Sequence, residues 1–318
     1  METLIVVGGG LAAALVGLAN QRLAGQRRIV LIEERHRFGG GPVQPFFTDS
    51  VSKEGMDLLA DAVVKEWSGY MVCERRTVLP DDTVLNHIPR PICVIAPEQL
   101  HADLVTFMPP EDLHLHADLG LLSIGRTTVD VSGLTIAGDA VLDLRSRGRI
   151  SSAARIEIEI GSHLPETSID LSMPVLADYS VETTGLMQYF PMSPHWLIMR
   201  RMRYLADGDP GSSRNQQGPA QDAEATRRST FMFDSPALPI PFAVPSALLP
   251  SEVPGAVALA LAIAACPKVT PEALREMLAN LAVSHQREGA ARLQGLKLLA
   301  QAEQDDLPFA AVTLADRL

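Results

Sequence analysis

The first 34 residues contain the pattern that most narrows what this chain can fold into. A short apolar run, Leu4 to Val7, precedes the glycines 8–10, and a helix-forming stretch then continues to Leu23. A second apolar run over residues 29–32 ends on the acid Glu33. This order of strand, glycine turn, helix, strand and acid predicts a βαβ unit that binds a dinucleotide. The alternative is a glycine-rich turn that binds nothing.

Small residues at this turn have separate roles in the predicted site. Gly8 permits the tight turn, Gly10 lets the backbone approach a pyrophosphate, and Ala13 lets the helix pack closely on the strand. Leu11, Ala12 and Ala13 supply the first N–H groups of the helix, and these attract phosphate together with the positive end of the helix dipole. All five residues are therefore predicted to contact the cofactor.

An acid and a second glycine turn refine the prediction. Glu33 stands 20 residues after Ala13, where a carboxylate accepts hydrogen bonds from ribose hydroxyls and disfavours the 2′-phosphate of NADP. Residues 37–41 read Arg-Phe-Gly-Gly-Gly directly after the second strand. Many flavoproteins place a second glycine turn at this point, so the pattern favours FAD over NAD and adds Gly40 to the predicted cofactor contacts.

Composition excludes several classes of protein. The 318 residues carry a net charge of −11, which disfavours nucleic acid as a partner. The three cysteines lack metal or redox spacing, so reduced thiols and a cytoplasmic location are expected. The N-terminus lacks a basic secretory leader, and the apolar runs are too short to span a membrane. Peripheral contact with the inner face of a membrane stays open.

The remaining pattern indicates an α/β protein: a Rossmann-type FAD-binding domain, an interleaved β-sheet substrate domain and C-terminal helices. We expect residues 1–150 to form mostly the FAD-binding lobe, 151–245 mostly the substrate sheet, and 246–318 a return to the FAD lobe. Helices are expected over residues 53–66, 97–107, 256–264, 271–284 and 287–302. Strands are expected over residues 70–80, 92–96, 113–116, 119–124, 127–131, 133–136, 139–144, 155–160, 185–191 and 195–204. Residues 206–229 are rich in Gly, Ser and Gln and are expected to form a loop.

Several short motifs occur in the same order as in a known family. They are the glycine turn with Glu33, the segment Glu66-Trp67-Ser68-Gly69-Tyr70, the run 140–145, the run Pro174 to Asp178 with Tyr189-Phe190-Pro191, and the end Leu314-Ala315-Asp316-Arg317-Leu318. In this order they resemble bacterial lycopene β-cyclases, and the chain looks like a divergent, shortened member. The resemblance implies a flavoprotein that closes the ends of lycopene into β-ionone rings in carotenoid biosynthesis.

That reaction is an acid-initiated isomerisation without net redox change. The resemblance implies FAD in its reduced form, NADPH as the electron donor, and the apolar polyene lycopene as the substrate. The protein must supply a proton donor, and negative charge or aromatic faces near the developing cation. Aromatic residues make up only 5% of this chain, and Gln44, Leu186 and Ser251 stand where the family motifs carry aromatic residues.

The family's acidic pair is also replaced. Its Glu and Asp positions fall on Arg200 and Arg201, and arginine has the wrong sign to stabilise a carbocation. The Arg200-Arg201-Met202-Arg203 run is interpreted as a surface strand with solvated charge, and the alternative is a phosphate clamp. Asp178 matches another family carboxylate and is a weak catalytic candidate, with a purely structural role as the alternative.

Two other functions stay open from the sequence. The chain is either a catalytically inactive paralogue that binds a carotenoid or flavin, or a general FAD-dependent oxidoreductase or monooxygenase. His114 and His116 are spaced for one face of a strand, but no third ligand is evident, so no metal is expected.

Overall fold

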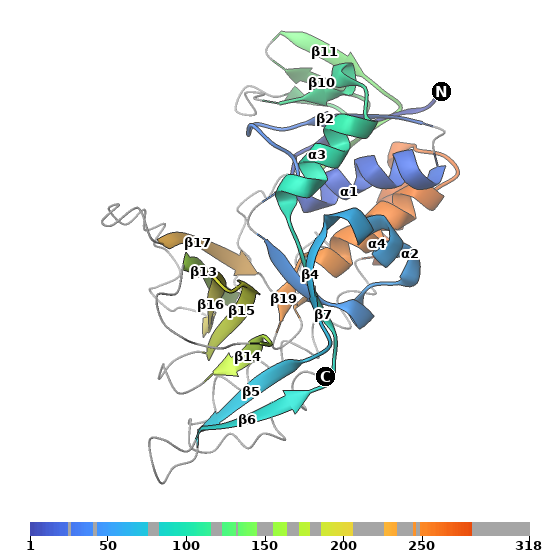
Figure 1. Ribbon diagram of the computed structural model, residues 1–318. Helices are drawn as coiled ribbons and strands as arrows, with labels where there is room; N and C mark the ends of the chain where they lie inside the picture. The colour runs from blue at the N-terminus through green and yellow to red at the C-terminus, as the bar shows by residue number, and fades with distance from the viewer. Residues whose placement is uncertain are drawn as a thin grey trace.

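The computed structural model in Figure 1 arranges the chain as two lobes, each built on a β-sheet. The described residues are 1–24, 27–40, 43–75, 83–115, 123–131, 133–144, 155–163, 172–178, 186–205, 226–233, 244–245 and 249–281. Features of the sequence analysis that lie outside the described residues include Gly41 of the second glycine turn, His116, and the helix expected over residues 287–302.

The first lobe contains the predicted parallel sheet. Its strand order is β12-β1-β2-β8, and all of its pairings are parallel. These strands are β1 (Thr3–Val7), β2 (Arg28–Ile32), β8 (Leu113–His114) and β12 (Ala140–Asp143). The apolar run of β1 is buried over Leu4 to Val7 because both faces of the sheet are covered. The α/β, Rossmann-type fold class is confirmed.

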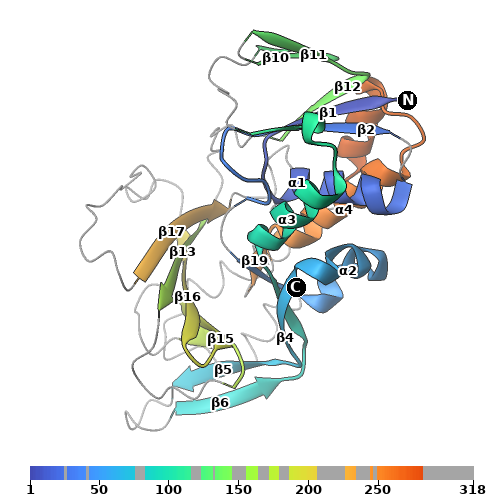
Figure 2. The same cartoon turned by 45° about the horizontal axis from the view of Figure 1, so that its top comes forward.

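Helices cover one face of this sheet and a small sheet covers the other (Figure 2). The helices are α1 (Leu11–Ala19), α3 (Pro97–Phe107) and α4 (Val253–Ala265). All nine residues of α1 are buried, and the helix continues as a π-helical turn over Asn20–Ala24. The covering sheet consists of β9 (Ser123–Ile124), β10 (Thr128–Val131) and β11 (Leu134–Ala137), and Val129 of this sheet packs against Ile5 and Val7 of β1.

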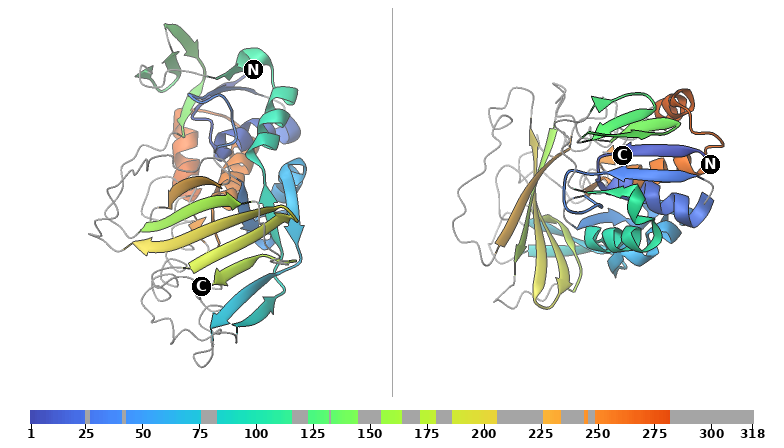
Figure 3. Two further views of the ribbon diagram at one scale, coloured as in Figure 1. Left: turned by 60° about the vertical axis from the view of Figure 1, so that its left-hand side comes forward. Right: turned by 90° about the horizontal axis from the view of Figure 1, so that it is seen from above.

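The second lobe is a seven-stranded sheet with the order β17-β13-β16-β15-β14-β5-β6. Figure 3 shows this sheet edge-on beside the first lobe. Its strands are β5 (Tyr70–Arg75), β6 (Thr83–Ile88), β13 (Arg155–His163), β14 (Val175–Asp178), β15 (Leu186–Ser193), β16 (Trp196–Leu205) and β17 (Thr226–Phe233). All neighbours are antiparallel except β14 and β5. The loop expected over residues 206–229 is wrong at its end. Residues 226–229 belong to β17 and pair with β13.

A three-stranded sheet with the order β3-β7-β4 joins the two lobes. It contains β3 (Gln44–Phe47), β4 (Val63–Trp67) and β7 (Ile92–Ile95). The expected helix over 53–66 is wrong in its second half. Helix α2 (Lys53–Leu59) and one 3-10 turn (Ala60–Ala62) end before β4, whose first four residues alternate between half-buried and exposed, as an edge strand does.

Two expected strands are confirmed, 92–96 as β7 and 139–144 as β12. Two expected helices are also confirmed, 97–107 as α3 and 256–264 as α4. A helix over residues 271–281 packs beside α4 and confirms the described part of the expected 271–284 helix. Among the described residues, no helix combines the length and the apolar character needed to span a bilayer.

Candidate functional site

The first glycine turn has the backbone geometry that its sequence requires. Gly8 adopts φ +104°, in the region that favours glycine, and its N–H donates to the carbonyl of Ile32 over 2.8 Å. A Cβ atom at Gly9 would lie 2.4 Å from the Glu33 carboxylate, whereas a Cβ atom at Gly10 would meet nothing within 4 Å. Glu33 therefore fills the space beside Gly9, whereas the space beside Gly10 is open.

Gly10 is exposed and caps α1 without a side chain. The first backbone hydrogen bond of α1 runs from the N–H of Ala14 to the carbonyl of Gly10. The N–H groups of Leu11, Ala12 and Ala13 precede this bond, so the helix offers them no acceptor. The structure thus brings together the open space at Gly10 and N–H groups of the kind that bind phosphate, and the cofactor contacts of these residues stay predictions.

Glu33 is buried and bonds to the backbone of the turn. One carboxylate oxygen accepts from the N–H of Gly9, and the other accepts from the N–H of Arg35 over 2.9 Å. An ionised carboxylate has about four acceptor sites, so two are left for ribose hydroxyls. Glu33 accordingly also stabilises the glycine turn, a role that the sequence pattern did not reveal.

The second glycine turn packs directly on the first. Gly39 and Gly40 adopt φ +97° and +84°, and the N–H of Gly39 donates to the carbonyl of Gly9 over 2.8 Å. A Cβ atom at Gly40 would lie only 3.0 Å from the amide nitrogen of Leu11. The absence of a side chain at Gly40 therefore keeps the start of α1 accessible.

Phe38 anchors this second turn in the core. Its ring is fully buried and lies 6.2 Å from the ring of His101, whose Nδ1 accepts from the N–H of Phe38 over 3.3 Å. Burial, followed by the charges of Arg37 and His36, lowers the pKa of His101 and favours the neutral ring that accepts this bond. Phe38 and His101 are 63 residues apart in the sequence, so no local pattern indicates this contact.

Helices α1 and α4 run side by side in the same direction. Asn20, at the end of α1, donates to the backbone carbonyl of Arg27 over 2.9 Å. The Arg27 guanidinium donates to the carbonyls of Ile263 and Cys266, at the end of α4. Because both C-terminal ends meet at Arg27, and the helices pack along each other, both N-terminal ends lie toward the glycine turns.

Glu252, at the start of α4, is a functional candidate that sequence reasoning missed. It is the N-cap residue, but its side chain makes no capping bond, and the neighbouring Ser251 Oγ accepts from the N–H of Val253. The Gln44 side chain hydrogen-bonds the Glu252 carboxyl, and burial raises the pKa of that carboxyl. In the sequence, Gln44 and Ser251 marked only departures from a family motif.

Arg200 is not the solvated surface charge that its basic run indicated. Only 2% of Arg200 is exposed, and burial lowers its pKa to about 9. Its guanidinium lies 5.9 Å from the centre of the Phe190 ring, which in turn lies 6.4 Å from Trp67. Arg200 therefore faces the sheet that joins the lobes, because Trp67 belongs to β4.

Arg201 follows Arg200 on β16 and points to the opposite face, as alternation along a strand requires. It stands in register with Met187, and Met187 stands in register with Asp178. Asp178 is buried at the end of β14. The structure places these residues in one row of the sheet, and their catalytic roles stay predictions.

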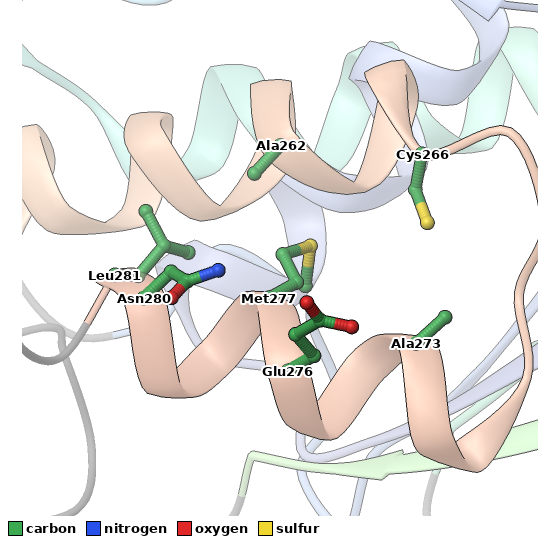
Figure 4. Close-up of a pocket in the computed structure, with 7 residues that line it drawn as sticks. All are labelled: Ala262, Cys266, Ala273, Glu276, Met277, Asn280 and Leu281. Carbon is green, nitrogen blue, oxygen red and sulfur yellow. The ribbon is translucent and has the colours of Figure 1, made fainter.

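Another hollow lies away from the glycine turns. A groove of about 480 Å³ separates α4 from the helix over residues 271–281 (Figure 4). Ala262 and Cys266 place it at the C-terminal end of α4, and its surface is mostly apolar. It is therefore not part of the dinucleotide site. The described residues contain no cluster of three or more residues suited to a metal ion.

Solved structures share the fold of this chain. No protein-family model and no curated protein matches the sequence. The chain is similar in structure to a geranylgeranyl bacteriochlorophyll reductase-like protein of Thermoplasma acidophilum, with a TM-score of 0.62 and 12% identity over 99% of this chain and 96% of that one.

Two further solved structures share this fold. One is the 2,6-dihydroxypyridine-3-hydroxylase of Arthrobacter nicotinovorans, with a TM-score of 0.59 and 14% identity over 97% of this chain and 94% of that one. The other is a variant of Klebsiella pneumoniae HpxO in complex with FAD, with a TM-score of 0.58 and 12% identity over 99% of this chain and 98% of that one. At these identities the comparisons support the fold class.

Proposed function

We propose that the chain is an FAD-dependent enzyme of the oxidoreductase or monooxygenase type. The observation that carries this proposal is the contact between the two glycine turns, which leaves Gly10 and the first N–H groups of α1 open to a pyrophosphate. In this proposal Glu33 would accept hydrogen bonds from the adenosine ribose. Bound FAD would supply hydride or oxygen chemistry, and the chain's own residues would bind and orient the cofactor.

The similar structures support an oxidoreductase over a cyclase. Their names describe a reductase-like protein, a hydroxylase and a protein bound to FAD. The buried charge of Arg200 adds to this argument, because a guanidinium on the face toward the joining sheet would repel a carbocation formed there. NADPH as the electron donor belongs to the same proposal.

Lycopene cyclisation is the second candidate, and two observations favour it. Glu252 is a carboxyl group that burial keeps protonated to higher pH, and the cyclisation needs such an acid. The name of one similar structure refers to a geranylgeranyl group, an isoprenoid as lycopene is. An apolar polyene substrate and peripheral contact with a membrane belong to this candidate.

The absorption spectrum of the purified protein tests the flavin proposal. We expect flavin bands after purification or after incubation with FAD and removal of the excess. A protein that binds neither FAD nor ADP contradicts the proposal. Expression in a lycopene-accumulating host separates the two candidates, because conversion of lycopene to β-carotene supports the cyclase. Unchanged lycopene, together with FAD reduction by NADPH, supports the oxidoreductase.

A further inference from the structure

A polar pair, Gln44 and Glu252, connects β3 to the start of α4. The Gln44 side chain hydrogen-bonds the Glu252 carboxyl, although the two residues are far apart in the sequence. Strands β3 and β19 (Pro250–Ser251) pack against each other, and this contact brings the pair together.

Within the described part of the chain, the Glu252 side chain does not cap α4 and one polar atom of Gln44 has no partner. Ser251 provides the capping bond at α4, so the Glu252 side chain is not needed there. The Oε1 atom of Gln44 is buried and has no hydrogen-bond partner among the described residues. A buried acceptor without a partner destabilises the fold, and a ligand that donates a hydrogen bond to it would recover this cost.

The chemistry of the pair defines what it would recognise. A carboxylic acid and a primary amide that share one hydrogen bond still offer one donor and one acceptor beside each other. The complementary ligand presents a carbonyl oxygen next to an N–H group. The pyrimidine ring of a flavin has such an edge, with N3–H between two carbonyl groups.

The position of the pair agrees with this ligand. Gln44 follows the second glycine turn by four residues, and Gly40 of that turn packs on the amide of Leu11. Glu252 begins the helix that runs beside α1 with its N-terminal end toward the same turns. A dinucleotide with its pyrophosphate at Gly10 would thus extend from the glycine turns toward the pair.

We propose that Gln44 and Glu252 bind the imide edge of the flavin ring, with Gln44 accepting from the ring N–H and Glu252 donating to a ring carbonyl. This inference rests on the proposed function, because it requires FAD at the glycine turns. It assigns two side chains from opposite ends of the chain to recognition of the ring, separately from the adenosine half.

Three ligands and three variants test the assignment. Dissociation constants for FAD, ADP and N3-methylated FAD are measured on the full chain for the wild type, Gln44→Leu and Glu252→Leu. Glu272→Leu, at an exposed carboxylate, serves as the matched control. Circular dichroism and thermal unfolding show whether each variant is folded.

We expect the wild type to bind FAD about tenfold more tightly than N3-methylated FAD, and Gln44→Leu to bind both equally. Glu252→Leu is expected to weaken FAD about tenfold, while ADP affinity stays unchanged in all variants. Unchanged discrimination in Gln44→Leu overturns the inference and leaves the flavin proposal standing. Equal losses of FAD and ADP also overturn it. A wild type that binds neither ligand contradicts the proposed function itself.

Discussion

The Arg27 guanidinium donates a hydrogen bond of 2.8 Å to the carbonyl oxygen of Ile263, 236 residues further along the chain. This bond fixes the C-terminal end of α4 beside that of α1, so both helix N-termini lie toward the glycine turns. A cation also interacts favourably with the negative end of a helix dipole.

Arg27→Met tests this relationship. The substitution leaves the carbonyls at the end of α4 without their donor, so we expect the free energy of unfolding to fall by about 2 kcal/mol. Urea unfolding of the full chain measures the change. Arg126→Met, at an exposed arginine, is the control and should stay within about 0.5 kcal/mol of the wild type. Equal effects of the two substitutions would contradict the role of Arg27.

Gly10→Ala should separate ligand binding from folding. A Cβ atom at Gly10 meets nothing within 4 Å, so the free energy of unfolding should change by less than about 1 kcal/mol. The added methyl group would occupy the approach of the pyrophosphate, so FAD affinity should fall at least about tenfold. Fluorescence titration with FAD measures this loss.

Gly9→Ala is the companion experiment at the next residue. Its Cβ atom would overlap the Glu33 carboxylate, so we expect the main effect on stability. If Gly10→Ala leaves FAD affinity intact, the pyrophosphate does not approach at this turn.

Gly40→Ala and Gly133→Ala form a matched pair of glycine substitutions. Their φ angles are +84° and +86°, so both should lose about 1 kcal/mol of stability through backbone strain. Only the methyl group at Gly40 would approach the Leu11 amide, because a Cβ atom at Gly133 meets nothing within 4 Å. ADP affinity should therefore fall for Gly40→Ala and stay unchanged for Gly133→Ala, as calorimetric titration can show.

The buried Arg200 predicts a pH dependence of stability. Burial lowers its pKa to about 9 in the folded protein, well below the ordinary pKa that it keeps in the unfolded chain, so burial of the charge opposes folding below pH 9. As the pH rises above 9, the folded protein releases this proton first, and the opposing contribution decreases. The stability difference between the wild type and Arg200→Met should therefore shift in favour of the wild type between pH 7 and pH 10.

Arg201→Met is the control for this titration, because Arg201 lies on the opposite face of β16. Its stability difference from the wild type should not change over the same pH interval. Urea unfolding at both pH values provides the measurement. A constant difference for Arg200→Met would show that the Arg200 charge is not buried in solution.

The local parts of the site could be predicted from the sequence. Gly8, Gly10, Ala13, Glu33 and Gly40 lie within 40 residues, and their roles depend on backbone conformation that short-range sequence encodes. The buried strand run of β1 and the proline at the start of α3 were equally local. The strand β4 was missed because its residues also suit a helix, and pairing with β7 decided between them.

The sequence by itself determined the Rossmann-type unit and its glycine turns, since these follow from residues that are neighbours in the chain. Only the tertiary structure decided the burial of Arg200 and the meeting of Gln44 with Glu252. Whether a charged side chain meets water or protein depends on which face of its strand another lobe covers. Contacts between distant segments form only when the whole chain packs, so no local pattern encodes them.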